Sequence, residues 1–190
     1  MHPIEVLLTP LGRAFRNRRS DESASLSLAP ELATDTRLHL ASPSFDDGGV
    51  IPAAHCGWLI GANVSPALTW RALPAGTVEL LLVFEDLDSP GTTPRLHTVA
   101  TLAASGDGIA EGALTSQTAG VRFVSVRGDK PGGYRGPRPL PGHGPHHYRF
   151  HLYALDTRLA DTDLAGIESL LHSANGHVLA SGTLAGTRTA

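Results

Sequence analysis

The stretch that decides the fold is GGYRGPRPLPGHGPHHYRFHLYALD, which runs from Gly132 to Asp156. Its first half is rich in glycine and proline, a composition typical of a loop with a fixed backbone conformation. Its second half, from Tyr148 to Leu155, is mainly apolar and predicts a buried strand. The stretch thus places His146 and Tyr148 where a rigid loop enters a strand, which is a typical position for the edge of a pocket.

Alternation along this strand divides its side chains between two faces, because residues two apart on a strand point the same way. One face is expected to carry His146, Tyr148, Phe150 and Leu152, and the other His147, Arg149, His151 and Tyr153. The face that carries His146 and Tyr148 is polar near the loop and becomes apolar toward the core. This change in polarity is expected at the mouth of a pocket. Imidazole and phenol groups there could bind an anion, with an affinity that falls as pH rises through the histidine pKa.

Composition narrows the class of protein. The chain has 190 residues, a formal net charge of -3 and a pI near 6.3, which favour a single globular domain and neither nucleic acid nor an anionic membrane as a partner. Cys56 is the only cysteine, so no intrachain disulfide is expected. Apolar runs such as Leu80–Phe84 are far shorter than the roughly 20 residues that span a bilayer. We therefore expect a cytoplasmic protein that is not integral to the membrane.

The distribution of turns predicts a mainly β fold. Twenty-one glycines and fourteen prolines are spread along the chain and favour short strands over long helices. We expect strands at 38–40, 78–84, 96–102, 121–126 and 148–155, and helices at 164–172 and 176–181. Residues 1–36 contain a polar stretch that cannot form a core, so they are predicted to be a partly irregular N-terminal extension to one domain at 37–190.

Four separated blocks occur in an order that resembles a known family. The first is SPSF at 42–45 with DGG at 47–49, IP at 51–52 and GANVSPALTW at 61–70; the second is PAGT at 74–77 leading to EDLDSP at 85–90. The third is LH at 96–97, and the fourth is the stretch 132–156 with GHVLA at 176–180. Together they span about residues 38–187. The chain resembles a phosphatidylethanolamine-binding protein of the bacterial branch often called Raf-kinase-inhibitor-like.

The resemblance implies a Greek-key β-sandwich with a few short peripheral helices and an anion pocket at one end of the sheets. It implies no cofactor, no metal and no general catalytic activity. The ligand-binding residues that it implies are Asp86, His97, Pro139, His146 and Tyr148. The residues implied to have a structural role at the pocket are Asp88, Pro90, Gly136 and Pro137. Leu87, Thr98 and Leu140 depart from the family pattern, and we therefore expect an open pocket.

Several functions are compatible with these residues. The favoured one is a non-catalytic protein that binds a small anion, either phosphate or a phospholipid headgroup. The alternative is an inhibitor or scaffold whose protein partner contacts the pocket rim. A hydrolase that uses Asp86, His97 and a nearby hydroxyl is the third reading. A metal site among His143, His146, His147 and His151 is disfavoured, because His147 and His151 would lie roughly 13 Å apart along a strand. His143 and His146 could chelate across the loop, but carboxylate and cysteine support is lacking. Exposed edge strands suggest a homodimer.

Overall fold

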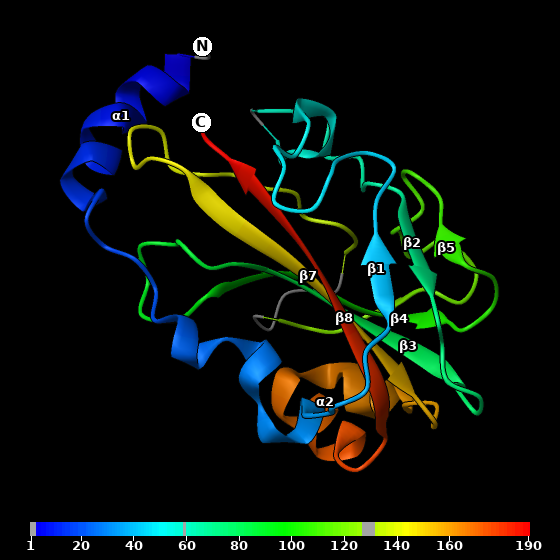
Figure 1. Ribbon diagram of the computed structural model, residues 1–190. Helices are drawn as coiled ribbons and strands as arrows, with labels where there is room; N and C mark the ends of the chain where they lie inside the picture. Colours follow the sequence, from blue (N-terminus) through cyan, green and yellow to red (C-terminus); the bar gives the residue numbers. More distant parts are fainter. Residues whose placement is uncertain (1–2, 59, 127–131) are drawn as a thin grey trace.

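The computed structural model describes residues 3–58, 60–126 and 132–190 (Figure 1). The helices in this part of the chain are α1 (Pro3–Phe15) and α2 (Ile167–Ala174). Short 3-10 turns occur at η1 (Glu22–Ala24), η2 (Leu26–Leu28), η3 (Pro30–Leu32), η4 (Ala53–His55) and η5 (Asp161–Ala165). The strands are β1 (His39–Ala41), β2 (Leu68–Arg71), β3 (Glu79–Asp86), β4 (Arg95–Ala103), β5 (Gly108–Ile109), β6 (Arg122–Phe123), β7 (His146–Leu155) and β8 (Val178–Arg188).

The strands form two antiparallel sheets that pack face to face. A five-stranded sheet has the order β6-β4-β3-β7-β8, and a three-stranded sheet has the order β1-β2-β5. The expected mainly β fold with peripheral helices is confirmed. No helix within the described residues has the length and apolar character to cross a bilayer.

Strand β3 lies at the centre of the larger sheet and is buried on both faces, as its continuous apolar sequence predicts. Leu80, Leu82 and Phe84 belong to the core between the two sheets. Leu81 and Val83 belong to a second core on the opposite face, which is covered by α2 and by the segment that includes Leu32. The strand therefore contributes side chains to both cores, and its last residue, Asp86, lies at one end of the sheet.

Most of the expected strands are present. Those at 38–40, 78–84, 96–102 and 148–155 correspond to β1, β3, β4 and β7, and that at 121–126 is reduced to the two residues of β6. The helix expected at 164–172 is divided at Gly166 into η5 and α2.

The helix expected at 176–181 is wrong, because this segment begins the long strand β8. Strand β8 is rich in small residues since other parts of the chain pack directly on its backbone. A Cβ on Gly182 would lie 2.7 Å from the carbonyl oxygen of Leu38, and one on Gly186 would lie 2.6 Å from the side chain of Ile51. These glycines follow residue 181; the segment from Val178 to Ser181 is itself a strand because it pairs with Leu155, Ala154 and Tyr153 of β7.

The N-terminal segment contains a helix, α1, that the sequence reading did not predict. After α1 the chain runs along the large sheet: the Ser20 hydroxyl donates to the carbonyl of Leu87, and the Ser25 hydroxyl donates to Glu85. Further on, η3 contacts α2. Residues 20–32 therefore form a strap, the segment that joins α1 to the far end of the sheet (Figure 1). The domain boundary at residue 36 stays a prediction.

Candidate functional site

The candidate site lies where β3, β4 and β7 end together. Asp86 is the last residue of β3 and pairs with Arg95 on β4 and Tyr148 on β7. Because paired residues share a face, the side chains of Asp86 and Tyr148 lie on the same side of the sheet as Phe84 and Phe150, whose rings stack 3.9 Å apart. The predicted alternation along β7 is thus present, and it brings the polar end of this face to the edge of the core.

His97 reaches the site through an irregularity in β4. Phe84 pairs with Thr98 and Glu85 with Leu96, so His97 is an additional residue in its strand, which is a β-bulge. The bulge lets the imidazole of His97 contact the rings of Phe84 and Tyr148, with centroids 5.4 and 5.6 Å away. The Nδ1–H of His97 donates to the carbonyl of Arg135 at 3.1 Å. Burial lowers the pKa of His97 to about 4, so the ring is neutral near pH 7.

His146 stands between a carboxylate and a second histidine. Its Nδ1–H donates to Asp86 at 2.8 Å, and its Nε2 lies 2.7 Å from Nδ1 of His143. The Nε2–H of His143 donates to the carbonyl of Arg18, and burial lowers the pKa of His143, so its Nδ1 is left as an acceptor. Nδ1 of His143 also lies 2.6 Å from a guanidinium nitrogen of Arg19, so both ring nitrogens of His143 and of His146 are engaged in one network.

Tyr148 forms the back of the site. The side chain is fully buried, and its ring stacks on that of His146 with centroids 6.2 Å apart. Its hydroxyl is buried and makes no hydrogen bond of good geometry, although the Asp86 carboxylate and the backbone of Arg138 lie beside it. Burial, together with the nearby Asp86 carboxylate, raises the pKa of Tyr148, which keeps the hydroxyl protonated and able to donate.

The loop after Gly133 is held against the sheet by two side chains. The backbone N–H of Gly136 donates to the side-chain oxygen of Asn63, and that of Arg135 donates to the Thr98 hydroxyl. A Cβ on Gly136 would lie 2.1 Å from the carbonyl oxygen of His55, so only glycine fits there. The backbone carbonyl of Pro137 accepts from the N–H of Gly57 at 2.8 Å. Thr98, which departs from the family pattern, thus fixes the loop through a hydrogen bond.

These elements surround an open cavity of about 590 Å³. Its lining includes six of the residues singled out from the sequence: Asp86, Pro90, His97, Gly136, Pro139 and His146. Tyr148 and Pro137 do not line the cavity: Tyr148 packs against His146, and the carbonyl of Pro137 accepts a hydrogen bond from Gly57. Leu8 of α1, Trp58, Arg95, Arg135 and Arg138 also line the cavity.

Asp88 faces away from this cavity. Its carboxylate accepts from the backbone N–H of His147 at 2.6 Å and forms an ion pair with Arg19 at 3.1 Å. Its own N–H donates to Asp86, at 2.9 Å. Asp88 therefore fixes the turn after β3 and joins it to the strap.

Sequence reasoning did not identify the contribution of the N-terminal segment. Arg18 and Arg19 contact His143, and Leu8 forms part of the cavity wall. Sequence reasoning treated His143 only as a candidate metal ligand. Among the described residues, no group of three or more histidine, cysteine or acidic side chains is arranged to hold a metal ion. No local pattern in the sequence indicates these contacts, because they join residues that are far apart in the chain.

Known proteins resemble this chain in sequence. A protein of Mycobacterium tuberculosis named as a lipoprotein, LppC, is 39% identical over 153 residues, which cover 78% of this chain and 73% of that protein. A UPF0098 protein of Methanothermobacter thermautotrophicus is 32% identical over 151 residues, which cover 78% of this chain and 97% of that protein.

A solved structure supports the same relationship. The Chlamydia trachomatis protein CT736, described as a homologue of phosphatidylethanolamine-binding protein, superposes with a TM-score of 0.67 at 28% identity, and the match covers 82% of this chain and 99% of that one. Residues 41–189 match the family described as phosphatidylethanolamine-binding protein. The chain therefore belongs to the phosphatidylethanolamine-binding protein family.

Proposed function

We propose that the cavity binds a small anion with a phosphate-like group, either free or as the headgroup of a phospholipid. The observation that carries the proposal is the charge of the lining. Three arginines, Arg95, Arg135 and Arg138, line the cavity, and Asp86 is the one acidic residue among the described residues of the lining. The lining therefore carries more basic than acidic side chains, a composition that favours an anionic ligand.

The buried hydroxyl of Tyr148 supports the same proposal. A buried polar group without a hydrogen-bond partner is unfavourable by about 1–3 kcal/mol and is rare in folded proteins. The Tyr148 hydroxyl lies beside Asp86 and the backbone of Arg138, and both of these residues line the cavity. A small shift of the loop at 135–139 on ligand binding would let it donate to a phosphate oxygen.

We propose binding and not catalysis. Both ring nitrogens of His146 are engaged, by Asp86 and by His143, so neither is available as a general base for a substrate. Nδ1 of His97 donates to a backbone carbonyl. These contacts support a fixed, pre-organised site, which argues against the hydrolase reading.

The experiment is a titration with inorganic phosphate and with phosphoethanolamine, followed by NMR of the histidine and backbone signals. We expect saturable shifts for residues that line the cavity, and at least about tenfold weaker binding in Arg138→Ala and His146→Gln. Tyr148→Phe should fold with equal or higher stability and still bind phosphate several-fold more weakly.

The matched control is His147→Gln, because His147 is adjacent in sequence but exposed on the other face of β7. It should bind phosphate within about twofold of the wild type. Absence of shifts at the cavity in the wild type would contradict the proposal. It would favour the alternative, in which a protein partner contacts the pocket rim.

For the location of the chain and its assembly we propose the cytoplasm and a homodimer through an edge strand. The outer edge of β8 is partly covered by bridges from Arg37 and Val50, and among the described residues β6 forms the opposite edge of the larger sheet. Because a relative is named as a lipoprotein, cell fractionation is the direct test of location. Analytical ultracentrifugation measures the assembly.

A further inference from the structure

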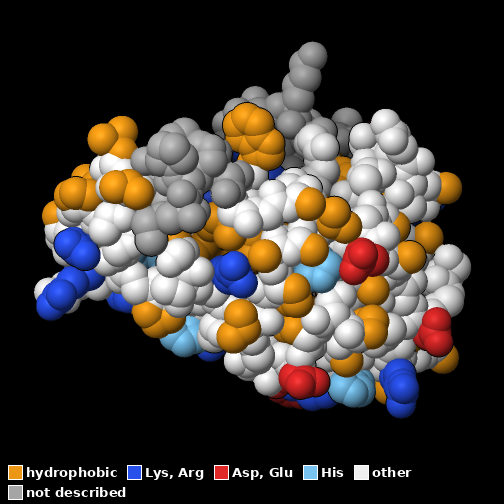
Figure 2. All heavy atoms as spheres, turned by 90° about the horizontal axis from the view of Figure 1, so that it is seen from above, with side chains coloured by type: hydrophobic (Ala, Val, Ile, Leu, Met, Phe, Trp, Pro, Cys, Tyr) orange, Lys and Arg blue, Asp and Glu red, His pale blue; other side chains and the backbone are white. Residues whose placement is uncertain are grey.

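Helix α1 presents an apolar face to solvent. Its inward side packs on the loop that precedes β7: a Cβ on Gly12 would lie 1.9 Å from the carbonyl oxygen of Pro141. Its outward side carries Val6, Leu7 and Leu11, and the side chain of Leu7 is 79% exposed. Seen from the end of the molecule where α1 lies, hydrophobic side chains gather over this helix (Figure 2). The outward face has no partner among the described residues.

A second exposed apolar group stands at the mouth of the same cavity. Trp58 is 77% exposed and lines the cavity together with Leu8 of α1. Exposed apolar side chains that lie together as a patch, and not singly, mark interaction sites. Helix α1, through Leu8, and the indole of Trp58 therefore border one opening.

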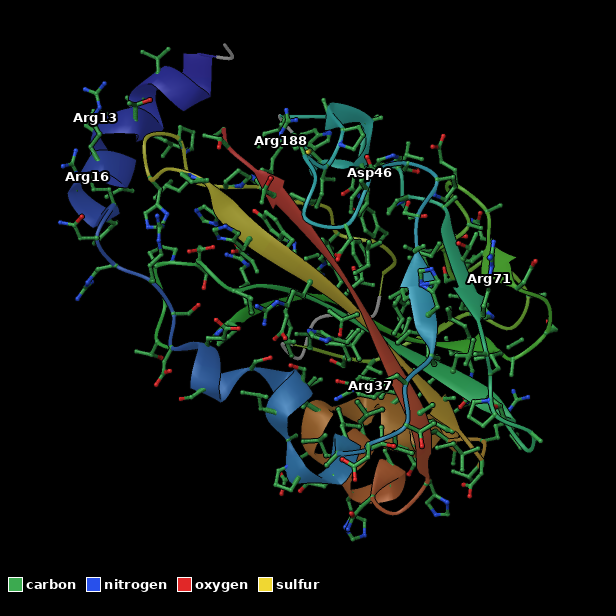
Figure 3. The ribbon with its side chains drawn as sticks, viewed as in Figure 1. Arg13, Arg16, Arg37, Asp46, Arg71 and Arg188 are labelled. Atoms are coloured by element: carbon green, nitrogen blue, oxygen red, sulfur yellow. The ribbon has the colours of Figure 1, made fainter. Side chains whose placement is uncertain are left out.

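Arginines accompany these apolar groups. Arg13, Arg16 and Arg18 are exposed at the end of α1 and just beyond it, and no acidic residue occurs between positions 6 and 20. The labelled side chains of Arg13 and Arg16 point away from the body of the molecule (Figure 3). Arg95 and Arg138 add positive charge at the cavity. This end is basic although the whole chain has a net charge of -3. The net charge, from which an anionic membrane is not expected as a partner, averages over the whole molecule and does not reveal a basic region at one end.

We propose that this end of the protein docks on an anionic phospholipid bilayer, with the outward face of α1 and Trp58 inserted among the headgroups. An amphipathic helix with exposed leucines and neighbouring arginines has the composition of an interfacial helix. Tryptophan is favoured at the depth of the headgroups, and arginines are attracted to anionic lipids. The cavity would then open toward the headgroup layer.

A second copy of the chain fits this surface less well than a bilayer does. A symmetric dimer through α1 would place the arginines of one copy against those of the other, since the same patch lies on both sides of a twofold interface. Like charges that face each other oppose association. An anionic bilayer instead supplies both an apolar interior and the opposite charge.

The test is sedimentation of the full chain with vesicles of phosphatidylcholine, with and without about one third phosphatidylglycerol. We expect binding that requires phosphatidylglycerol and falls by about tenfold or more in the double variant Leu7→Asp with Leu11→Asp. Trp58→Ala should weaken binding several-fold. The fluorescence of Trp58 should shift to shorter wavelength on binding, whereas Trp70 is buried and gives a constant background.

The matched control is the double variant Leu28→Asp with Val78→Asp. Both residues are exposed leucine or valine side chains, and Val78 precedes β3 at the end of the sheet opposite to Asp86. This variant should bind vesicles within about twofold of the wild type. Leu7→Ser with Leu11→Ser is a milder pair if the aspartates unfold α1, which circular dichroism would reveal.

Two results would overturn the proposal. One is that the wild type does not bind vesicles, or binds them equally well with the α1 substitutions. If the wild type is then a dimer that the same substitutions dissociate, a second copy of the chain is the occupant of this surface. The other is loss of vesicle binding in His146→Gln with full binding in the α1 variant, which would assign the contact to the pocket alone. Conversely, failure of phosphate binding would overturn the proposed pocket function and leave docking through α1 unaffected.

Discussion

Asp86, His146 and His143 form a hydrogen-bonded chain that runs from the end of β3 to the N-terminal segment. Asp86 and His146 are almost completely buried, so each needs the other: an isolated buried charge would be strongly unfavourable. The Nε2–H of His143 in turn donates to the backbone carbonyl of Arg18. These hydrogen bonds fix the orientation of His146. They also connect the residues that follow α1 to the side chains of the site.

At the residue scale, we predict that His97 makes the protein less stable in acid. Its pKa is about 4 in the folded chain, below the usual 6.5. Between these values the unfolded chain binds a proton that the folded chain does not, so the free energy of unfolding falls as pH falls. The loss between about pH 7.5 and about pH 5 is about 2 kcal/mol.

Urea unfolding of the wild type and of His97→Gln at both pH values measures this term. The wild type should lose about 2 kcal/mol more than the variant. His39→Gln, at an exposed histidine of β1, should keep the wild-type dependence. Equal losses in the wild type and in His97→Gln would show that the imidazole of His97 is not the cause.

At the scale of elements, α1 and the loop before β7 approach at backbone distance. Gly12 faces the carbonyl of Pro141, and Gly142, with φ at +82°, faces the carbonyl of Thr9. Two glycines are thus used to bring a helix onto the loop that carries the site. The contact explains how Leu8 comes to line the cavity.

We predict that Gly12→Ala loosens α1, although alanine normally favours a helix over glycine by about 1 kcal/mol. The added Cβ would lie 1.9 Å from a carbonyl oxygen, so the helix must move away from the loop. Tryptic cleavage at the arginines between positions 13 and 19 should then be several-fold faster. The control is Gly76→Ala, a turn position with φ at +88° and no neighbouring atom, which should leave this cleavage rate unchanged. An unchanged rate in Gly12→Ala would mean that the contact is not retained in solution.

At the scale of the whole molecule, the five-stranded sheet needs a cover on each face. The three-stranded sheet covers one face, and α2 with the strap covers the other. Leu32 is buried in the second core, and Ser25 donates to the fully buried carboxylate of Glu85. The strap is therefore part of the folded structure and not only a connection to α1.

We predict that residues 37–190 alone are less stable than the full chain by about 3–5 kcal/mol. This sum combines the exposure of Leu32 and its neighbours with the loss of a hydrogen bond to a buried carboxylate. Urea unfolding of the full chain, of 37–190 and of 16–190 measures it. The shorter deletion removes α1 but keeps the strap, so it should have the smaller effect. Equal midpoints for all three would support the boundary at residue 36 as that of an independent domain.

The sequence by itself determined the parts of the protein that follow from local pattern. The continuous apolar run of β3 indicates a strand buried on both faces, and the alternation of β7 places His146 and Tyr148 on the face that leads into the core. The ordered motifs indicate the family and bring Asp86, His97, Pro139 and His146 to one cavity. These signals are readable because burial and strand geometry constrain residues that are near each other in the chain.

Only the tertiary structure decided the rest. The bulge that turns His97 toward Tyr148 depends on pairing with β3. The helix predicted at 176–181 is wrong because pairing with β7 makes a strand of the chain from Val178 onward. The contacts of Arg18 with His143 and of Leu8 with the cavity join positions far apart in the sequence. Such contacts arise from the packing of finished elements, so no periodicity within the N-terminal segment encodes them.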